Sequence, residues 1–527
     1  MRGEKTRNTF LFTAIMILAI VTPAVAEDWL TYGHDAQRTG WAFQEDKLTV
    51  KNVGGLELKW KIHLDNKALS LTALTAPLTA SDVTTPEGVK TLVYIAGSSN
   101  HVFAVDAATG KLSWSHDFTA HVSPAYAGMW LCPNNLNATP TIDRKAGLIY
   151  VLNAEGRIFG LDLGTGKERL GPVQFVPPYS KVWSLNLFGG VIYTSISQNC
   201  ADAQSGIYAL DLRDPNRPLV RELFVDERGG GIWGRGGPVI SPDGRLFAAT
   251  GDGDFDPSVG RFGSSVIALA TPSLRVVDYY SPNDYERLTR YDLDLGATGA
   301  AWFADASYHL SATGGKGGTL YLMNADSLGD LDHHTPLEVL RLSNDEQAYE
   351  ENGIWGSISS WRDGDGTTWV YVPVWGAISK DAPKFPLQNG PSPNGCIMAF
   401  QVGRDSDTHK PVLVPAWTSV DLNRPDPVAI ANGVVFGIST GENPQQTAGT
   451  RVVYHGQKLL SDVERGENTR HVILYAMDAK TGKVLYSSRD LITAWVHFSG
   501  LAVANGQVYV VDHDSNLYCF GLKSDQK

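Results

Sequence analysis

The sequence contains few cysteines, and none of them lies in a motif that attaches haem or binds zinc. Its four cysteines, Cys132, Cys200, Cys396 and Cys519, are widely spaced. No CxxC or CxxCH occurs, which excludes a covalently attached c-type haem within this chain. In an oxidising compartment one pair could form a disulfide, and four cysteines allow three connectivities. The alternating apolar residues around Cys519 favour a buried free thiol at that position.

Clusters of basic residues are also lacking. The 527-residue chain has 44 lysines and arginines against 56 aspartates and glutamates, for a formal net charge of −12. Because nucleic-acid binding depends on clustered lysine and arginine, this composition argues against a nucleic-acid partner. No nucleophile elbow and no Walker loop occurs, so hydrolase and NTPase functions are not indicated.

Long apolar segments are confined to the N-terminus. Arg2, Lys5 and Arg7 precede an apolar run from Phe10 to Val21, and Ala24-Val25-Ala26 follows it. The run is shorter than the roughly 20 residues that a membrane-spanning helix needs. We therefore expect residues 1–26 to be a cleaved signal peptide and the mature chain to be periplasmic or secreted, with no membrane span.

Glycine and aromatic residues are abundant, with 54 glycines, 14 tryptophans and 20 tyrosines. They occur in a recurring unit: a strand, a short Gly/Asn/Asp turn, a second strand ending in aromatic-Ala-x-Asp, and a Thr-Gly-Lys turn. The clearest copies begin at Leu92, Gly147 and His471, and weaker copies begin at Gly190, Gly244, His309, Trp369 and Gly506. The sequence therefore contains eight units, counting the strand that begins at Gly433 with the copy at His471.

Each unit alternates apolar and polar residues, which indicates a hairpin with one buried face. A single hairpin cannot bury that face, whereas sheets packed radially around an axis can. The sequence therefore predicts one all-β domain over residues 27–527, a single eight-bladed β-propeller of four-stranded antiparallel blades. The last unit lacks an outer strand, and we expect residues 55–64 to supply it by pairing with the blade that contains residues 508–520.

The unit resembles a known repeat. The segments "AVDAATGKLSW" and "AMDAKTGKVLY", together with the opening "WLTYGHDAQRTG", are similar to the propellers that bind pyrroloquinoline quinone (PQQ). This resemblance to the quinoprotein alcohol dehydrogenase superfamily covers nearly all of residues 27–527. It implies oxidation of an alcohol or sugar with PQQ and calcium, and transfer of electrons to a separate soluble carrier such as a cytochrome c. Non-catalytic envelope scaffolds share the repeat, so a protein-binding role is the alternative.

The resemblance implies a cofactor site in the stretch "GGGIWGRGGPVISPDGRLFAATGDGDFDP". Trp233, followed by Gly234, would form the flat floor beneath the quinone, and Asp252 would bind the calcium ion. An indole face suits a planar ligand, adjacent glycines permit close approach, and carboxylate oxygens suit calcium. The alternative is that Trp233 packs between blades and the aspartates form a solvated turn.

Two later segments complete the implied site. In "YDLDLG", Asp292 matches the catalytic base and Asp294 would be a second carboxylate near the metal. In "GGKGG", Lys316 matches the cation that stabilises negative charge on the reduced quinone. The chain departs from the family pattern in lacking adjacent cysteines, in having Asp252 in place of asparagine, and in offering only Asp202 where a calcium-binding glutamate is expected. These aspartates could equally bind a structural ion.

Overall fold

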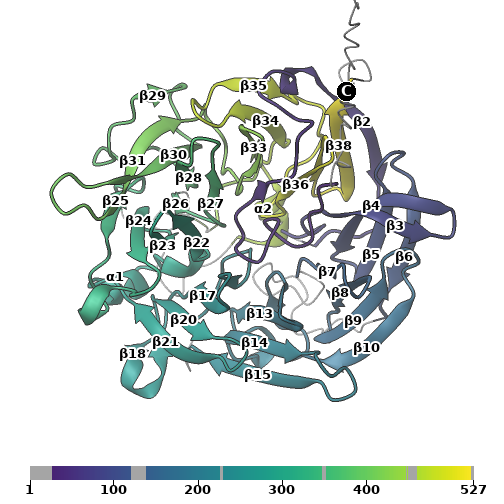
Figure 1. The fold of residues 1–527 in the computed structure, drawn as a ribbon, viewed down its shortest axis with the longest axis horizontal. Coiled ribbons are helices and arrows are strands. Elements are labelled where there is room, and N and C mark those ends of the chain that lie inside the picture. The colour runs from purple at the N-terminus through teal and green to yellow at the C-terminus, as the bar shows by residue number, and fades with distance from the viewer. Residues whose placement is uncertain are drawn as a thin grey trace, which may run out of the picture.

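The computed structural model describes residues 26–69, 71–119, 138–225, 230–346, 352–446, 448 and 460–523. Within these ranges, eight sheets of four or more strands are arranged in a ring around one axis (Figure 1). We number these sheets blades 1 to 8 in chain order. The predicted eight-bladed propeller is confirmed.

Blades 1 to 4 are mostly simple antiparallel sheets. Blade 1 contains β3 (Leu78–Thr85), β4 (Gly88–Gly97), β5 (His101–Asp106) and β6 (Leu112–Asp117). Blade 2 contains β7 (Thr141–Asp143), β8 (Leu148–Leu152), β9 (Arg157–Asp162) and β10 (Glu168–Gln174). Blade 3 contains β11 (Lys181–Val182), β12 (Asn186–Phe188), β13 (Val191–Ser197), β14 (Gly206–Asp211) and β15 (Leu219–Phe224). Blade 4 contains β16 (Val239–Ile240), β17 (Arg245–Ala249), β20 (Val266–Ala270) and β21 (Arg275–Tyr280).

Blade 5 is a four-stranded sheet, blade 6 has additional strands, and blades 7 and 8 each include a strand from the N-terminal side of the chain. Blade 5 contains β22 (Ala301–Asp305), β23 (Tyr308–Gly314), β24 (Thr319–Asn324) and β25 (Glu338–Arg341). Blade 6 contains β26 (Gly353–Ile354), β27 (Ser359–Arg362), β28 (Thr368–Trp375), β29 (Leu387–Gln388), β30 (Gly395–Arg404) and β31 (Pro411–Thr418). Blade 7 contains β32 (Ala429–Ala431), β33 (Val434–Ser439), β34 (Ile473–Asp478), β35 (Val484–Ser487) and the N-terminal β1 (Trp41–Ala42). Blade 8 contains β36 (Leu501–Ala504), β37 (Gln507–Val511), β38 (Asn516–Leu522) and β2 (Leu56–His63).

Few other elements occur in the described ranges. A two-stranded ribbon of β18 (Phe255–Asp256) and β19 (Arg261–Phe262) extends from blade 4. The helices α1 (Tyr285–Arg290) and α2 (Asp462–Gly466) are short. No helix in the described part of the chain has the length and apolarity needed to span a membrane.

The ring is closed by the strand from the N-terminal side of the chain. β2 pairs antiparallel with β38, from Leu56 opposite Leu522 to His63 opposite Asn516. This pairing confirms the predicted closure. It joins segments more than 450 residues apart and removes the last unpaired strand edges of blade 8.

The repeated Asp-x-x-Thr-Gly-Lys turn joins neighbouring blades. In three places a tryptophan on the outer strand of one blade donates its indole N–H to a backbone carbonyl in the turn of the next blade, at 2.9 Å. The accepting residue is the one that directly follows the Asp of that turn. The indole also lies on the glycine of that turn, where any Cβ would collide with it. The three pairs are Trp60 with Gly110, Trp114 with Gly166, and Trp417 with Gly482. Glycine is needed because these residues have φ near +70° as well as an aromatic ring against them.

Trp417 is fully buried, and its removal tests this contact between blades 6 and 7. We expect Trp417→Ala to lower the free energy of unfolding by about 3–5 kcal/mol because it leaves a cavity between the blades. Trp417→Phe keeps a ring and loses the hydrogen bond to Ala479, so it should cost about 1 kcal/mol. Denaturant unfolding checks both values, and equal losses for the two variants would contradict the packing role.

The N-terminal segment, residues 29–42, runs around the inner strands (Figure 1). It forms backbone hydrogen bonds in turn with Thr79 of blade 1, Ile142 of blade 2, Ile240 of blade 4, Ser360 of blade 6 and Ile430 of blade 7. Its buried Tyr32 contacts Gly236 and Gly500, so residues of opposite blades meet around one side chain. The segment therefore links blades on different sides of the axis through these backbone hydrogen bonds and the contacts of Tyr32.

The cysteines divide into two kinds. Cys200 is disulfide-bonded, whereas Cys396 and Cys519 are free and buried, as expected for Cys519. Cys132 lies outside the described residues. Of the expected signal peptide, residues 1–25 also lie outside them.

Candidate functional site

The candidate site lies where loops of several blades meet at one end of the axis. In each blade the loop entering the first strand and the loop between the second and third strands emerge at the same end, because neighbouring strands are antiparallel. Asp252 follows β17 in blade 4, Asp292 and Asp294 precede β22 in blade 5, and Lys316 lies between β23 and β24. The topology therefore brings these four residues to one mouth of the ring.

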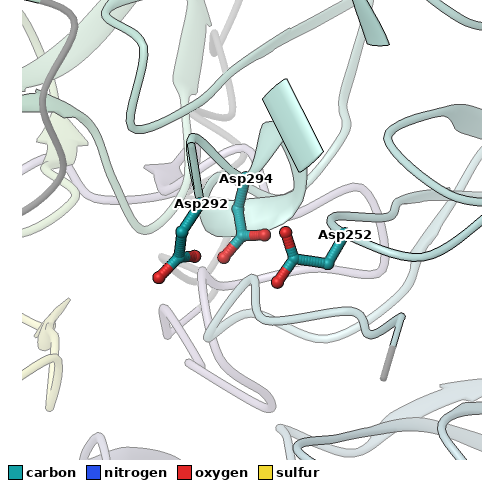
Figure 2. A group of neighbouring side chains, drawn as sticks. All are labelled: Asp252, Asp292 and Asp294. Carbon is teal, nitrogen blue, oxygen red and sulfur yellow. The ribbon is translucent and has the colours of Figure 1, made fainter. Parts of the chain in front are cut away.

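Three carboxylates converge at this mouth. One oxygen each of Asp252, Asp292 and Asp294 lies within 4.8 Å of the others. Figure 2 shows the three side chains directed toward one another from two separate loops. We call these residues the aspartate group. Three carboxylates at this spacing are a donor set that suits a hard cation.

Lys316 forms the positive partner of the aspartate group. Its Nζ lies 2.6 Å from Asp292 Oδ1 and 2.6 Å from Asp294 Oδ2. The Lys316 side chain is buried, and its Nζ also lies 5.6 Å from the centroid of the Trp355 ring. The buried Lys316 ammonium thus forms ion pairs with two carboxylates.

Backbone strain and close packing position the aspartate group. Asp252 and Asp292 have φ values of 50° and 53°, in the left-handed region that non-glycine residues rarely adopt. A Cβ on Gly251 would lie 2.6 Å from Asp294 Oδ1, and a Cβ on Gly315 would lie 2.2 Å from the Asp294 carbonyl oxygen. These two glycines therefore allow the loops of blades 4 and 5 to approach closely enough for the carboxylates to meet.

The aspartate group carries more negative charge than Lys316 offsets. Burial raises the pKa of Asp252 well above its usual range, and the neighbouring Asp294 and Asp292 carboxylates raise it further. Asp294 Oδ1 is buried and receives no hydrogen bond from the described residues. A metal ion bound here would supply the missing positive charge and a partner for that oxygen, so the residues fit a cation.

Trp233 lies beside the aspartate group rather than within it. Its indole Nε1 donates to Gln198 Oε1 at 3.1 Å, and its ring lies against Gly231. Gly231 pairs with Gly251 through two backbone hydrogen bonds, and Gly251 contacts Asp294. Gly234 packs onto the backbone of Gly299, which precedes β22. Gly231 and Gly251 therefore lie between the half-buried indole and the carboxylates. This arrangement suits a flat ligand that stacks on the indole beside a metal ion held by the carboxylates.

Asp202 is not part of the aspartate group. It is exposed and ends a short 3₁₀ turn, Cys200–Asp202, between β13 and β14. Gln198, Asn199, Ala201 and Asp202 all have positive φ values between 45° and 70°. This left-handed run sets the direction of the carboxylate, and it could not be deduced from the residue types.

Trp355, which contacts Lys316, belongs to a stack of three aromatic rings. Trp355 stacks on Trp375 with ring centroids 4.7 Å apart, and Trp375 stacks on Phe498 at 5.2 Å. Trp355 is therefore buried within a stack of aromatic rings. Trp495 instead stacks on His513 at 4.2 Å, and His309 pairs with Asp326 at the surface, both away from the aspartate group.

A buried charge cluster beyond this aromatic stack has no motif in the sequence. Glu442, which is 1% exposed, lies 2.6 Å from Arg465 Nη2 and 2.8 Å from His497 Nδ1. Burial would raise the pKa of Glu442, but His497, Arg465 and Arg424 outweigh burial and lower it to about 2. Burial lowers the pKa of His497, whose Nδ1–H donates a hydrogen bond to Glu442 Oε2.

Glu442→Gln tests this cluster through its pH dependence. The folded-state pKa lies below the ordinary value, so the contribution of Glu442 is present above about pH 4.5 and lost as the pH falls toward 2. We expect the variant to be about 3 kcal/mol less stable at pH 7, with the difference shrinking near pH 3. Urea unfolding at both pH values checks this, with the exposed Glu168→Gln as a control. A difference independent of pH would contradict the ionised cluster.

Comparison with known proteins agrees with the fold and the repeat. Residues 29–171 match the family model of the PQQ β-propeller domain of glucose, ethanol and alcohol dehydrogenases. The quinohemoprotein alcohol dehydrogenase of Comamonas testosteroni is 28% identical over 163 residues, which is 31% of this chain. The dehydrogenase subunit of the quinone-dependent alcohol dehydrogenase of Komagataeibacter europaeus is 29% identical over 159 residues. Part of the chain is therefore similar in sequence to quinoprotein alcohol dehydrogenases.

The sequence matches cover less than a third of this chain, whereas the structural matches cover nearly all of it. The aligned segments of this chain span only 19% and 18% of the lengths of those two proteins. In contrast, the crystal structure of the Comamonas enzyme superposes on 94% of this chain with a TM-score of 0.56 and 14% identity, covering 80% of that chain. A europium-containing methanol dehydrogenase superposes on 94% of this chain with a TM-score of 0.57 and 13% identity, covering 98% of that chain. At these identities the structural matches establish the fold.

Proposed function

We propose that this protein is an exported dehydrogenase that oxidises an alcohol or sugar with PQQ and a calcium ion. The observation that carries the proposal is the meeting of Asp252, Asp292, Asp294 and Lys316 at one mouth of the ring, beside the indole of Trp233. Blade packing does not require three carboxylates from two loops to converge on one buried ammonium. The named activity of the relatives supports the reaction class.

Each residue has a distinct role in this proposal. Asp252 and Asp294 bind the cation, and Asp292 takes the hydroxyl proton of the substrate. Lys316 pairs with Asp292 at 2.6 Å and would donate hydrogen bonds to a bound quinone. Trp233 and Gly234 form a flat surface for the cofactor. When bound, PQQ would supply the electrophile that accepts hydride from the alcohol carbon.

A cleft at the same mouth offers a route for a polar substrate. It has a volume of about 280 Å³ and lies among the loops of blades 5, 6 and 7. Its wall residue Asn344 donates to the carbonyl oxygen of Lys316 at 2.6 Å, and Arg424 lies over the Trp375 ring at 4.5 Å. Amide and carboxylate groups, including those of Asp345, Glu346 and Asn394, line the cleft. This lining suits a substrate that carries hydroxyl groups.

Reconstitution tests the proposed function. The purified protein would be treated with a chelator and then supplied with PQQ and either calcium or europium, the latter because one structural relative contains it. We expect dye-linked oxidation of members of an alcohol and sugar panel only when PQQ and a cation are both present. Electrons would then pass in the cell to a separate soluble carrier such as a cytochrome c. A protein that oxidises nothing on the panel and binds no PQQ would favour the envelope scaffold function.

A further inference from the structure

Two cations share one tryptophan beside the candidate site. Lys181 begins β11, Trp183 lies between β11 and β12, and Arg235 precedes β16. Lys181 Nζ lies 5.3 Å from the centroid of the Trp183 ring, and the Arg235 guanidinium carbon lies 5.6 Å from it. Trp183 donates to Ser197, whose Cβ lies near Gly231 beneath the Trp233 ring. Blades 3 and 4 therefore present an ammonium and a guanidinium beside the indole proposed to hold the cofactor.

These cations lack the fixed partners that other buried cations have. Arg235 is 5% exposed, and its Nη2 is buried with no hydrogen-bond acceptor among the described residues. By contrast, the buried Arg465 pairs with Glu442 and also donates to two backbone carbonyls. Within the described ranges, no carboxylate forms an ion pair with Lys181 or Arg235. A buried, unpartnered guanidinium is costly unless a ligand neutralises it.

One acid, Asp426, interacts electrostatically with Arg235 but forms no ion pair with it. Asp426 is fully buried and accepts the backbone N–H of Gly500 at 3.1 Å. Burial raises its pKa to about 7, and Glu442 contributes to that increase. Burial also lowers the pKa of Lys181 to about 7, and repulsion by Arg235 and Lys316 adds to this effect. Lys316 is paired with Asp292 and Asp294, whereas Lys181 and Arg235 have no ion pair with a carboxylate of the described residues.

We propose that Lys181 and Arg235, on the face of Trp183, bind a carboxylate of a ligand held at this mouth. The guanidinium can bind a carboxylate through two parallel hydrogen bonds, and the lysine adds a third donor. The inference extends the proposed function, since PQQ carries carboxylate groups. A carboxylate-bearing alcohol substrate offers the same chemistry, and the two sources are separable by experiment.

The test uses Lys181→Met, because Lys181 is half-buried and its loss should not unfold the ring. If the cofactor supplies the carboxylate, calorimetry should show PQQ binding weakened by about 10- to 100-fold, the value of one charge-assisted hydrogen bond. Calcium affinity should be unchanged, because the aspartate group is intact. Lys181→Arg should restore most of the PQQ affinity, and the exposed Lys111→Met should behave as wild type.

The remaining outcomes separate this inference from the proposed function. Unchanged PQQ affinity with a tenfold higher KM for a hydroxy acid, but not for a neutral alcohol, would assign the carboxylate to the substrate. If the wild type binds no PQQ, the proposed function fails. Benzene-1,3,5-tricarboxylate then serves as the probe, and weaker binding by Lys181→Met would still support the carboxylate site. Equal binding of every carboxylate by wild type and Lys181→Met would overturn it.

Discussion

Asp292→Asn should lower turnover by about 10²- to 10⁴-fold while leaving calcium and PQQ bound, because asparagine keeps the size and one oxygen but cannot accept the hydroxyl proton. The carboxylate is 2.6 Å from Lys316 Nζ and has an oxygen within 4.8 Å of oxygens of Asp252 and Asp294. Steady-state kinetics with saturating PQQ and calcium measures the loss, and calorimetry measures retention of both ligands.

The control for this variant is Asp284→Asn. Asp284 precedes α1, only eight residues before Asp292, and forms an exposed pair with Arg287. We expect the activity of the Asp284→Asn variant to equal that of the wild type. An Asp292→Asn protein with undiminished turnover would show that another group accepts the proton, and it would remove Asp292 from the proposed mechanism.

Lys316→Met should have the second large effect, on stability and on cofactor retention together. The substitution leaves Asp292 and Asp294 without the ammonium that contacts both of them. Breaking a buried ion pair by removing one partner typically costs about 3–5 kcal/mol, so the metal-free variant should be less stable by that amount. Thermal unfolding with and without calcium measures this effect.

Calcium should restore part of the lost stability of Lys316→Met, since a bound cation compensates the same carboxylates. Its PQQ affinity should remain reduced, because the hydrogen bonds to the quinone are absent. Lys410→Met, at an exposed position, serves as the control and should match the wild type. A Lys316→Met protein of wild-type stability would indicate that the aspartate group is protonated and does not need the ammonium.

The fold could be predicted from the sequence because each blade repeats the same local contacts. The Asp-x-x-Thr-Gly-Lys turn recurs since its glycine must accept both a positive φ and a tryptophan from the preceding blade, as at Gly110 and Gly166. The closing strand was also predictable, because β38 would otherwise leave an unpaired edge. The path of residues 29–42 around the axis was not, since its hydrogen bonds use backbone groups that carry no sequence signal.

The candidate site was predictable only where a motif marks it. Asp252, Asp292, Asp294 and Lys316 lie in segments that resemble a known family, and the structure brings them together. Asp202 lies outside the aspartate group, within a run of left-handed residues that the residue types do not reveal. Lys181, Arg235, Glu442 and His497 carry no motif, and their relation to the site depends on which blades are neighbours in the ring.

Calorimetric titration of PQQ into the calcium-loaded protein tests the central claim most directly. The account predicts saturable binding at one PQQ per chain. It further predicts that Asp294→Asn, which alters the aspartate group, weakens calcium binding and with it PQQ binding. Absence of PQQ binding to the wild-type protein, with calcium bound at the aspartate group, would contradict the account and leave the group as a structural ion site.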